Sequence, residues 1–196
     1  MTAPTLKSYA PPPVDVREVL RYARSSESDK AATSLLPSVI AEAEPHLSYR
    51  VAYREVEVSV RGEDVALGGI AARSRRLAEC LAPCPSALLL AATVGTALDR
   101  LMARYTRLSP ARALLLGALG TERVEALCDL FCADREVTRG RRTAVRFSPG
   151  YGDLPLALQR EFLPYLDAER YLGITLSPSL LMSPSKSVTA IVGILD

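Results

Sequence analysis

The chain has 196 residues, of which 48% are hydrophobic and 23% are charged, and its formal net charge is +2. This length and composition fit one globular domain with a sizeable core. The balanced charge argues against nucleic acid or an anionic membrane as a partner. No apolar run approaches the roughly 20 residues of a membrane-spanning helix, and the N-terminus lacks an apolar signal segment, so we expect a cytoplasmic protein.

The first residues predict an arm outside the folded domain. Residues 1–13 end in three consecutive prolines, a composition that favours extended backbone over packed structure. We therefore expect a flexible N-terminal arm over 1–13 and one domain over 14–196. No internal repeat or low-complexity tract interrupts that domain.

Two helices are expected next. Apolar residues recur at helical spacing over 14–24, where Asp15 and Glu18 have the spacing of an N-terminal cap. A second helical pattern covers 26–45 and contains Pro37. Because proline removes a backbone donor and clashes with the preceding turn, we expect a kink or a break there.

The clearest strand signal lies over 49–60. Its apolar residues change parity near Arg54, which predicts a strand with a bulge or bend at that point. A short amphipathic helix is expected over 74–82. The run 87–95 is apolar at almost every position, as is typical of a central strand buried on both faces.

Helices and short strands fill the second half of the chain. A helix over 97–107 is followed by a Ser-Pro start signal at 109–110 and a long helix that Gly117 and Gly120 can loosen. Residues 141–147 resemble a strand, and extended runs close the chain. Because strands and helices mix without βαβ repetition, we predict an α+β domain with a twisted, mostly antiparallel sheet flanked by helices.

Several kinds of chemistry are disfavoured by the motifs that the sequence lacks. It contains no glycine-rich phosphate loop and no dinucleotide fingerprint. A histidine-dependent nucleophile would have to use His46, which stands in a junction typical of a surface residue. The pairs Cys80/Cys84 and Cys128/Cys132 fit ordinary thiols better than a metal site, because one pair lies in an apolar helix and prolines interrupt the other.

The stretch RFSPGY, Arg146 to Tyr151, combines groups suited to a ligand with a carboxylate and a flat ring. Arg146 offers a planar fork of donors, and Gly150 lets a ligand approach the backbone. The backbone of Phe147 and Ser148 can meet an adenine or ribose edge, and Tyr151 adds an aromatic face. The alternative is a polar loop without a ligand.

Two further groups are candidates. Glu125 and Asp129 lie four residues apart on the long helix, so they share a face that can hold a ligand amino group or simply be solvated. Lys186 and Ser187 stand among hydroxyls in MSPSKS, which is otherwise a surface turn.

Two motifs in order resemble a known family. RFSPGY and the segment LLMSPSKSVTAIVGI, residues 180–194, resemble the activation domain of cobalamin-dependent methionine synthase. The resemblance covers most of residues 14–195 and is strongest in the last 50. It implies an α+β domain that binds S-adenosylmethionine and presents its methyl group to cobalamin, after a flavodoxin-type reductant has reduced the oxidised cobalt.

The resemblance also implies roles for particular residues. Arg146 would hold the ligand carboxylate or nearby ribose, the Ser148 backbone would meet adenine, and Gly150 and Tyr151 would shape the same wall. An acidic residue should meet the ligand amino group. The candidates for that role and for the flank of the site are Glu125, Asp129, Lys186 and Ser187.

The chain departs from the multidomain enzyme in one important respect. It has no D-x-H-x-x-G motif for cobalamin, so cobalamin would be carried by a partner, either a methionine synthase or another corrinoid protein. We therefore expect a stand-alone methyltransferase component for methionine synthase reactivation, which acts in trans in methionine biosynthesis. A non-catalytic interaction subunit with a vestigial ligand site is the alternative, and an unrelated small-molecule methyltransferase is a third.

Overall fold

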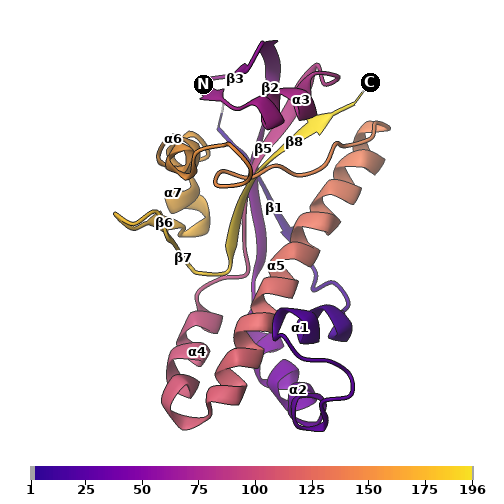
Figure 1. Cartoon of the computed structure of the whole chain (residues 1–196), viewed down its shortest axis with the longest axis vertical. Coiled ribbons are helices and arrows are strands. Elements are labelled where there is room, and N and C mark those ends of the chain that lie inside the picture. Colours follow the sequence, from indigo (N-terminus) through magenta and orange to yellow (C-terminus); the bar gives the residue numbers. More distant parts are fainter. Residues whose placement is uncertain (1–2, 196) are drawn as a thin grey trace.

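The computed structural model describes residues 3–195 and shows an α+β fold around a six-stranded antiparallel sheet (Figure 1). This confirms the predicted fold class. β1 pairs with the first half of β2, beside the main path of the sheet. In spatial order that path contains β4 (Ile70–Arg73), β3 (Asp64–Leu67), β2 (Tyr49–Arg61), β5 (Ser86–Thr93) and β8 (Ser187–Ile194), and β1 is Thr5–Tyr9.

Helices cover both faces of the sheet. The 30-residue helix α5 (Pro110–Arg139) packs on one face, where Leu127 and Phe131 contact Leu88 and Leu90 in a buried cluster. The opposite face is covered by α3 (Arg75–Leu81), the 3-10 turn η2 (Leu156–Leu158), α6 (Gln159–Tyr165) and α7 (Ala168–Leu172). A two-stranded sheet of β6 (Thr175–Leu176) and β7 (Met182–Ser183) lies beside α6 and α7 (Figure 1).

A helical end extends beyond the sheet. The N-terminal half of α5 leaves the sheet and packs through residues such as Leu116 and Leu119 against the neighbouring helices (Figure 1). These are α1 (Val16–Tyr22), α2 (Lys30–Ala43) and α4 (Ala97–Leu108), and α2 continues into the 3-10 turn η1 (Glu44–His46). Among residues 3–195, none of the helices combines the length and apolar character that a membrane crossing requires.

The predicted bulge in β2 is wrong. The pairing of β2 with β5 runs without interruption from Arg50 to Glu57. The odd residues Val51 and Tyr53 face the α5 side of the sheet, whereas Val56 faces the opposite core. Side chains alternate between the two faces of a strand. The parity change therefore means that the first half of β2 buries apolar side chains against α5, whereas the second half buries them on the opposite face.

The predicted unpacked arm is also wrong for residues 5–9. β1 pairs antiparallel with β2, from Thr5 opposite Tyr53 to Tyr9 opposite Tyr49. Lys7 Nζ and Tyr9 Oη each donate a hydrogen bond of 2.6 Å to the Asp134 carboxylate on α5. Proline-rich composition indicated extended backbone correctly, but these long-range contacts attach that backbone to the domain.

The break that Pro37 could cause does not occur, because α2 continues through this residue. α5 is also continuous through Gly117 and Gly120, where the sequence indicated a loosened helix. Gly120 has a packing role, because a Cβ there would come within 2.1 Å of Leu98 Cδ2 and 2.8 Å of Lys186 Cγ. The predicted cap of α1 is confirmed, since the Asp15 carboxylate accepts hydrogen bonds from two backbone amides of the first turn.

Candidate functional site

The RFSPGY stretch follows an extended segment beside β8. Phe147 exchanges two backbone hydrogen bonds with Ile191, of 2.9 and 2.7 Å, and Thr143 bridges to Ile194. Phe147 is buried in the core away from α5. Because alternate side chains of an extended chain point to opposite sides, Arg146 and Ser148 point toward α5.

Arg146 meets both predicted carboxylates of α5. Its Nη2 donates to Glu125 Oε2 at 2.6 Å, and its Nη1 donates to Asp129 Oδ1. The four-residue spacing on the helix places the two carboxylates on one face, one turn apart. The Arg146 side chain is 22% exposed, whereas that of Asp129 is 73% exposed. The guanidinium is therefore half-buried, and one of its two anionic partners is open to solvent.

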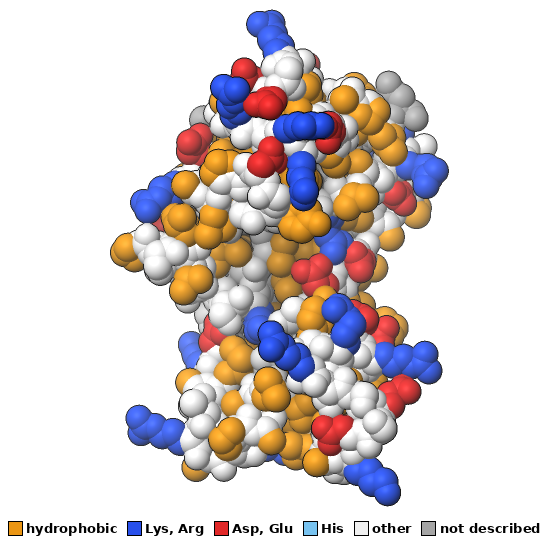
Figure 2. Space-filling view, in the orientation of Figure 1, with side chains coloured by type: hydrophobic (Ala, Val, Ile, Leu, Met, Phe, Trp, Pro, Cys, Tyr) orange, Lys and Arg blue, Asp and Glu red, His pale blue; other side chains and the backbone are white. Residues whose placement is uncertain are grey.

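Two hollows adjoin this ion pair. One, of about 450 Å³, lies between α5 and the extended segment and is lined by the ion-pair residues with Cys132, Thr143, Ala144, Val145, Ser148 and Val188. The other, of about 610 Å³, lies between the ion-pair residues and the N-terminal segment that contains Pro12, Pro13 and Asp15. The surface narrows to a hollowed waist between the sheet and the helical end, with acidic and basic side chains beside it (Figure 2). The Arg146 ion pair forms a wall shared by both hollows.

The second hollow is markedly acidic. Five of its six charged lining residues are acidic, namely Asp15, Glu18, Glu122, Glu125 and Asp129, and Arg146 is the sixth. Arg123 and Arg21 offset the charges of Glu122 and Glu18 by direct pairing. An acidic hollow with one arginine in its wall suits a ligand that is cationic overall but carries a carboxylate.

The Arg146 ion pair can exchange partners with the amino acid part of a ligand. That part carries one carboxylate and one ammonium group. If the ligand carboxylate takes the place of Asp129 at Arg146, the displaced carboxylate can pair with the ammonium group, so each charge keeps a partner. Arg146, Glu125 and Asp129 together carry a net charge of −1, which complements the net +1 of S-adenosylmethionine.

The thiols at this face are not activated. Burial raises the pKa of Cys132, and Arg146 lowers it by a smaller amount. Cys128, on α5 like Cys132, is fully buried, and burial raises its pKa as well. Both thiols are therefore protonated at neutral pH, and the hollow offers charged and hydrogen-bonding groups rather than a nucleophile.

The turn after Arg146 is held by contacts within the protein. Gly150 has φ +90°, and its missing side chain would point at Leu156, 3.0 Å away, so the turn itself requires glycine. The Asp153 carboxylate accepts from Ser74 Oγ at 2.5 Å and from the amide of Arg75 at 2.8 Å, and thereby caps α3. Tyr151 lies exposed and packs edge-to-face on Phe147.

The backbone of Phe147 and Ser148 was a candidate for an adenine or ribose edge. The Phe147 amide is engaged, because it donates to Ile191, whereas the Phe147 carbonyl accepts one hydrogen bond from Ile191 and keeps one lone pair. The Ser148 carbonyl accepts from the Tyr151 amide at 2.9 Å, so it keeps one lone pair for a ligand. Ser148 lines the Arg146 hollow, whereas Gly150 and Tyr151 belong to the adjoining turn.

Lys186 and Ser187 lie apart from Arg146. Lys186 Nζ donates to Thr121 Oγ1 at 2.9 Å, one helical turn before Glu125, and burial lowers the Lys186 pKa. Ser187 Oγ donates to Thr93 Oγ1 at 2.9 Å on the sheet face away from α5. The structure brings together Arg146, Glu125, Asp129 and Ser148, and places Lys186 at one end of the same helix face.

Other residues around the hollows were not anticipated. Glu122 stands three residues before Glu125, and Cys132 three after Asp129, so their helical spacing was a usable signal. Pro12, Pro13 and Asp15 reach the second hollow from a different part of the chain. Since the sequence showed only a helix cap and a proline run there, no local pattern could place those residues beside α5.

Comparison with known proteins yields a structural match. The fold is similar to that in the crystal structure of the MetH reactivation domain bound to AdoHcy, with a TM-score of 0.65, 15% sequence identity, and coverage of 88% of this chain and 68% of that chain. No protein-family model matches the sequence, and no curated protein sequence matches it. At this identity the match shows the fold, and the expected likeness to the reactivation domain is confirmed at that level.

Proposed function

We propose that this chain binds S-adenosylmethionine at the Arg146 hollows and supports the reductive methylation of oxidised cobalamin on a separate protein. The observation that carries the proposal is the meeting of Arg146 with Glu125 and Asp129 in a solvent-accessible wall. The structural neighbour binds AdoHcy, the demethylated product of this ligand. The RFSPGY motif, on which the sequence resemblance rests, contributes Arg146 and Ser148 to the lining of one of these hollows.

The residues present supply binding and orientation. Arg146 would hold the ligand carboxylate, Asp129 or Glu125 the ammonium group, and Ser148 an edge of the nucleoside. Holding both ends of the ligand leaves the sulfonium methyl to face a partner, so the chain contributes position rather than acid-base chemistry. Tyr151 and Gly150 would border the nucleoside. The Lys186 ammonium group would lie one helical turn farther along α5, beside Thr121, whereas the Ser187 hydroxyl faces away from α5.

Cobalamin would be carried by the partner, a cobalamin-dependent methionine synthase or another corrinoid protein. When bound there, cobalamin supplies the cobalt nucleophile that accepts the methyl group. A flavodoxin-type reductant would supply the electron. On this proposal the chain is a methyltransferase component that works in trans.

The first test is a calorimetric titration of the purified chain with S-adenosylmethionine. Arg146→Ala should weaken binding at least about ten-fold, because it removes charge-assisted hydrogen bonds to the ligand carboxylate. Arg139→Ala is the matched control, since Arg139 also pairs with a carboxylate, that of Glu55, but lines neither hollow. Equal affinity of wild type and Arg146→Ala, or no heat with millimolar ligand, would refute binding at this site.

One observation favours a second function. Glu125 and Asp129 already neutralise Arg146, so this ion pair can have a purely structural role. The chain would then be a non-catalytic interaction subunit with a vestigial ligand site. A pull-down with a purified methionine synthase that lacks its own reactivation domain separates the two functions. Capture that S-adenosylmethionine does not alter, without restored synthase activity, would favour the interaction subunit.

A further inference from the structure

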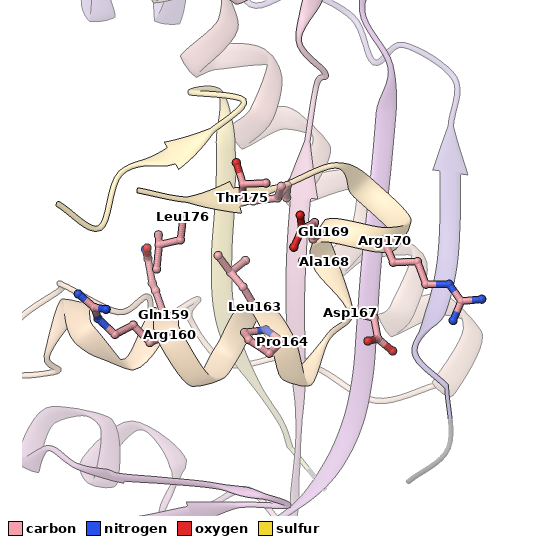
Figure 3. A pocket seen from close by; sticks show the side chains of 11 residues that line it. Gln159, Arg160, Leu163, Pro164, Asp167, Ala168, Glu169, Arg170, Thr175 and Leu176 are labelled. Atoms are coloured by element: carbon pink, nitrogen blue, oxygen red, sulfur yellow. The ribbon is translucent and has the colours of Figure 1, made fainter. Parts of the chain in front are cut away.

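A further hollow lies away from Arg146. It has a volume of about 870 Å³ and is bounded by α6, α7 and β6 (Figure 3). It shares no lining residue with either hollow beside Arg146. Pockets for small organic ligands have volumes of roughly 300–1,000 Å³, so this hollow is large enough for one.

The floor of the hollow consists of core residues. Leu163, Ala168 and Ile174 are buried members of the core on this face of the sheet, and each also lines the hollow. Figure 3 shows Leu163 rising from α6 and Leu176 descending from β6, so apolar side chains bound a slot between the two elements. An apolar slot of this form suits a flat hydrophobic body.

One buried polar group faces this slot without a partner. Gln159 is only 5% exposed, and its Oε1 has no hydrogen-bond partner within residues 3–195. Figure 3 shows its side chain extending from α6 toward Leu176. Burying an amide oxygen without a partner costs about 1–3 kcal/mol, and buried polar groups are usually satisfied. A donor on a bound ligand would supply the missing hydrogen bond.

The rim of the hollow is electrically balanced. Arg160 and Arg170 are the basic residues that line it, and Asp167 and Glu169 are the acidic ones. All four are exposed. Two positive and two negative charges give no preference for an anion or a cation, which favours an uncharged ligand.

We propose that this hollow binds a neutral, flat organic molecule that donates one N–H or O–H hydrogen bond to Gln159. Its apolar body would lie against Leu163 and Leu176. Because the terminal torsion of a glutamine side chain is soft, a small rotation of the amide turns Oε1 toward the ligand. This binding is independent of the Arg146 hollows, so either proposal can fail alone.

Indole and 1-methylindole make a matched pair of probes. Both have the same flat body, but only indole carries an N–H donor. In two-dimensional ¹H–¹⁵N NMR, indole should shift resonances of α6, α7 and β6, and it should bind about five-fold more tightly than 1-methylindole, the value of one ordinary hydrogen bond. Equal affinities, or shifts confined to other elements, would overturn the proposal.

A variant separates the hydrogen bond from the apolar contact. Gln159→Met keeps the length of the side chain but removes the amide, so the two probes should bind it equally well. Leu158→Met is the matched control, because it introduces the same residue at the neighbouring buried position outside the hollow, and it should retain the five-fold preference. A preference that persists in a folded Gln159→Met variant would refute the role of Gln159. If that variant does not fold, the wild-type comparison of the probes still decides.

Discussion

Two arginines that pair with glutamates of α5 differ in their surroundings. Arg123 is fully buried, with its Nε 2.5 Å from Glu122 Oε2 and its other nitrogens donating to the carbonyls of Pro12 and Pro13. Arg146 is 22% exposed, and its partner Asp129 lies largely in solvent. The first pair fastens the N-terminal segment to α5, whereas the second borders two hollows.

The difference shows that burial, rather than pairing, separates a structural ion pair from a candidate binding site. A buried pair cannot exchange its partners, because a lone charge left in the interior has no water to replace the lost contacts. A half-buried pair can release one carboxylate to solvent at little cost and accept another. The same residue types are therefore expected to fix the chain at Arg123 and to bind a ligand at Arg146.

The largest expected effect comes from breaking the buried pair. Among residues 3–195, Arg123→Ala leaves the buried Glu122 carboxylate with only the Asp15 amide as a donor, and should lower the free energy of unfolding by about 3–5 kcal/mol. Arg146→Ala should lower it by about 1 kcal/mol or less, since Glu125 and Asp129 can turn to solvent. Urea unfolding of both variants measures the contrast.

A double variant provides the control for that contrast. Glu122→Leu combined with Arg123→Met removes both charges and keeps the volume, so it should recover most of the stability that Arg123→Ala loses. If Arg123→Ala and Arg146→Ala cost the same, then burial does not separate the two pairs and the comparison fails.

An intermediate effect is expected at Asp134, which attaches β1 to α5. Burial acts to raise the pKa of Asp134, but hydrogen bonds from Lys7, Tyr9 and Arg135 outweigh it and hold the pKa well below its usual range. A carboxyl with a lowered pKa in the folded state stabilises the protein above its unfolded pKa of about 4, and this stability is lost as the pH falls. Asp134→Asn should cost about 1 kcal/mol at neutral pH.

The pH dependence tests the cause of that loss. The stability difference between wild type and Asp134→Asn should be constant above about pH 5 and shrink toward about pH 2, because the Asp134 carboxyl takes up its proton in the unfolded chain while it stays ionised in the folded one. Urea unfolding across this range gives the measurement. A difference that stays the same at low pH would mean that the carboxylate charge does not hold β1.

The long elements of the fold could be predicted from the sequence because their periodicity is local. The alternation in β2, the apolar run of β5 and the helical pattern of α5 each extend over enough residues to show a period. The strands β3 and β4 have four residues each, too few for a pattern. β1 was missed because pairing of an extended segment depends on a partner about 40 residues away.

The candidate site could be predicted only in part, for the same reason. Helical spacing grouped Glu125 with Asp129, and the RFSPGY motif singled out Arg146, but their contact depends on the path of the chain between α5 and β8. The engagement of the Phe147 amide with Ile191 could not be predicted, because a sequence does not show which backbone groups a strand will use. Gln159 gave no signal at all, since its missing partner is a property of the packed structure.

The smallest expected effect concerns the charge of the exposed carboxylate beside Arg146. Asp129→Asn changes the net charge of the group formed with Arg146 and Glu125 from −1 to zero. S-adenosylmethionine carries a sulfonium charge that AdoHcy lacks, so the variant should reduce the preference for S-adenosylmethionine over AdoHcy. At a separation of several ångströms in water this charge contributes about 0.5–1 kcal/mol, or two- to five-fold in the ratio of the two Kd values.

Salt and a distant charge provide the controls. The preference of the wild type should fall toward that of Asp129→Asn as the salt concentration approaches about 1 M, where the screening length is only about 3 Å. Glu161→Gln, which removes an exposed acidic charge on α6, should leave the ratio unchanged. If Asp129→Asn does not alter the ratio of the two Kd values at low salt, the Asp129 carboxylate does not interact electrostatically with the ligand. The proposed exchange of partners at Arg146 would then lose its electrostatic basis.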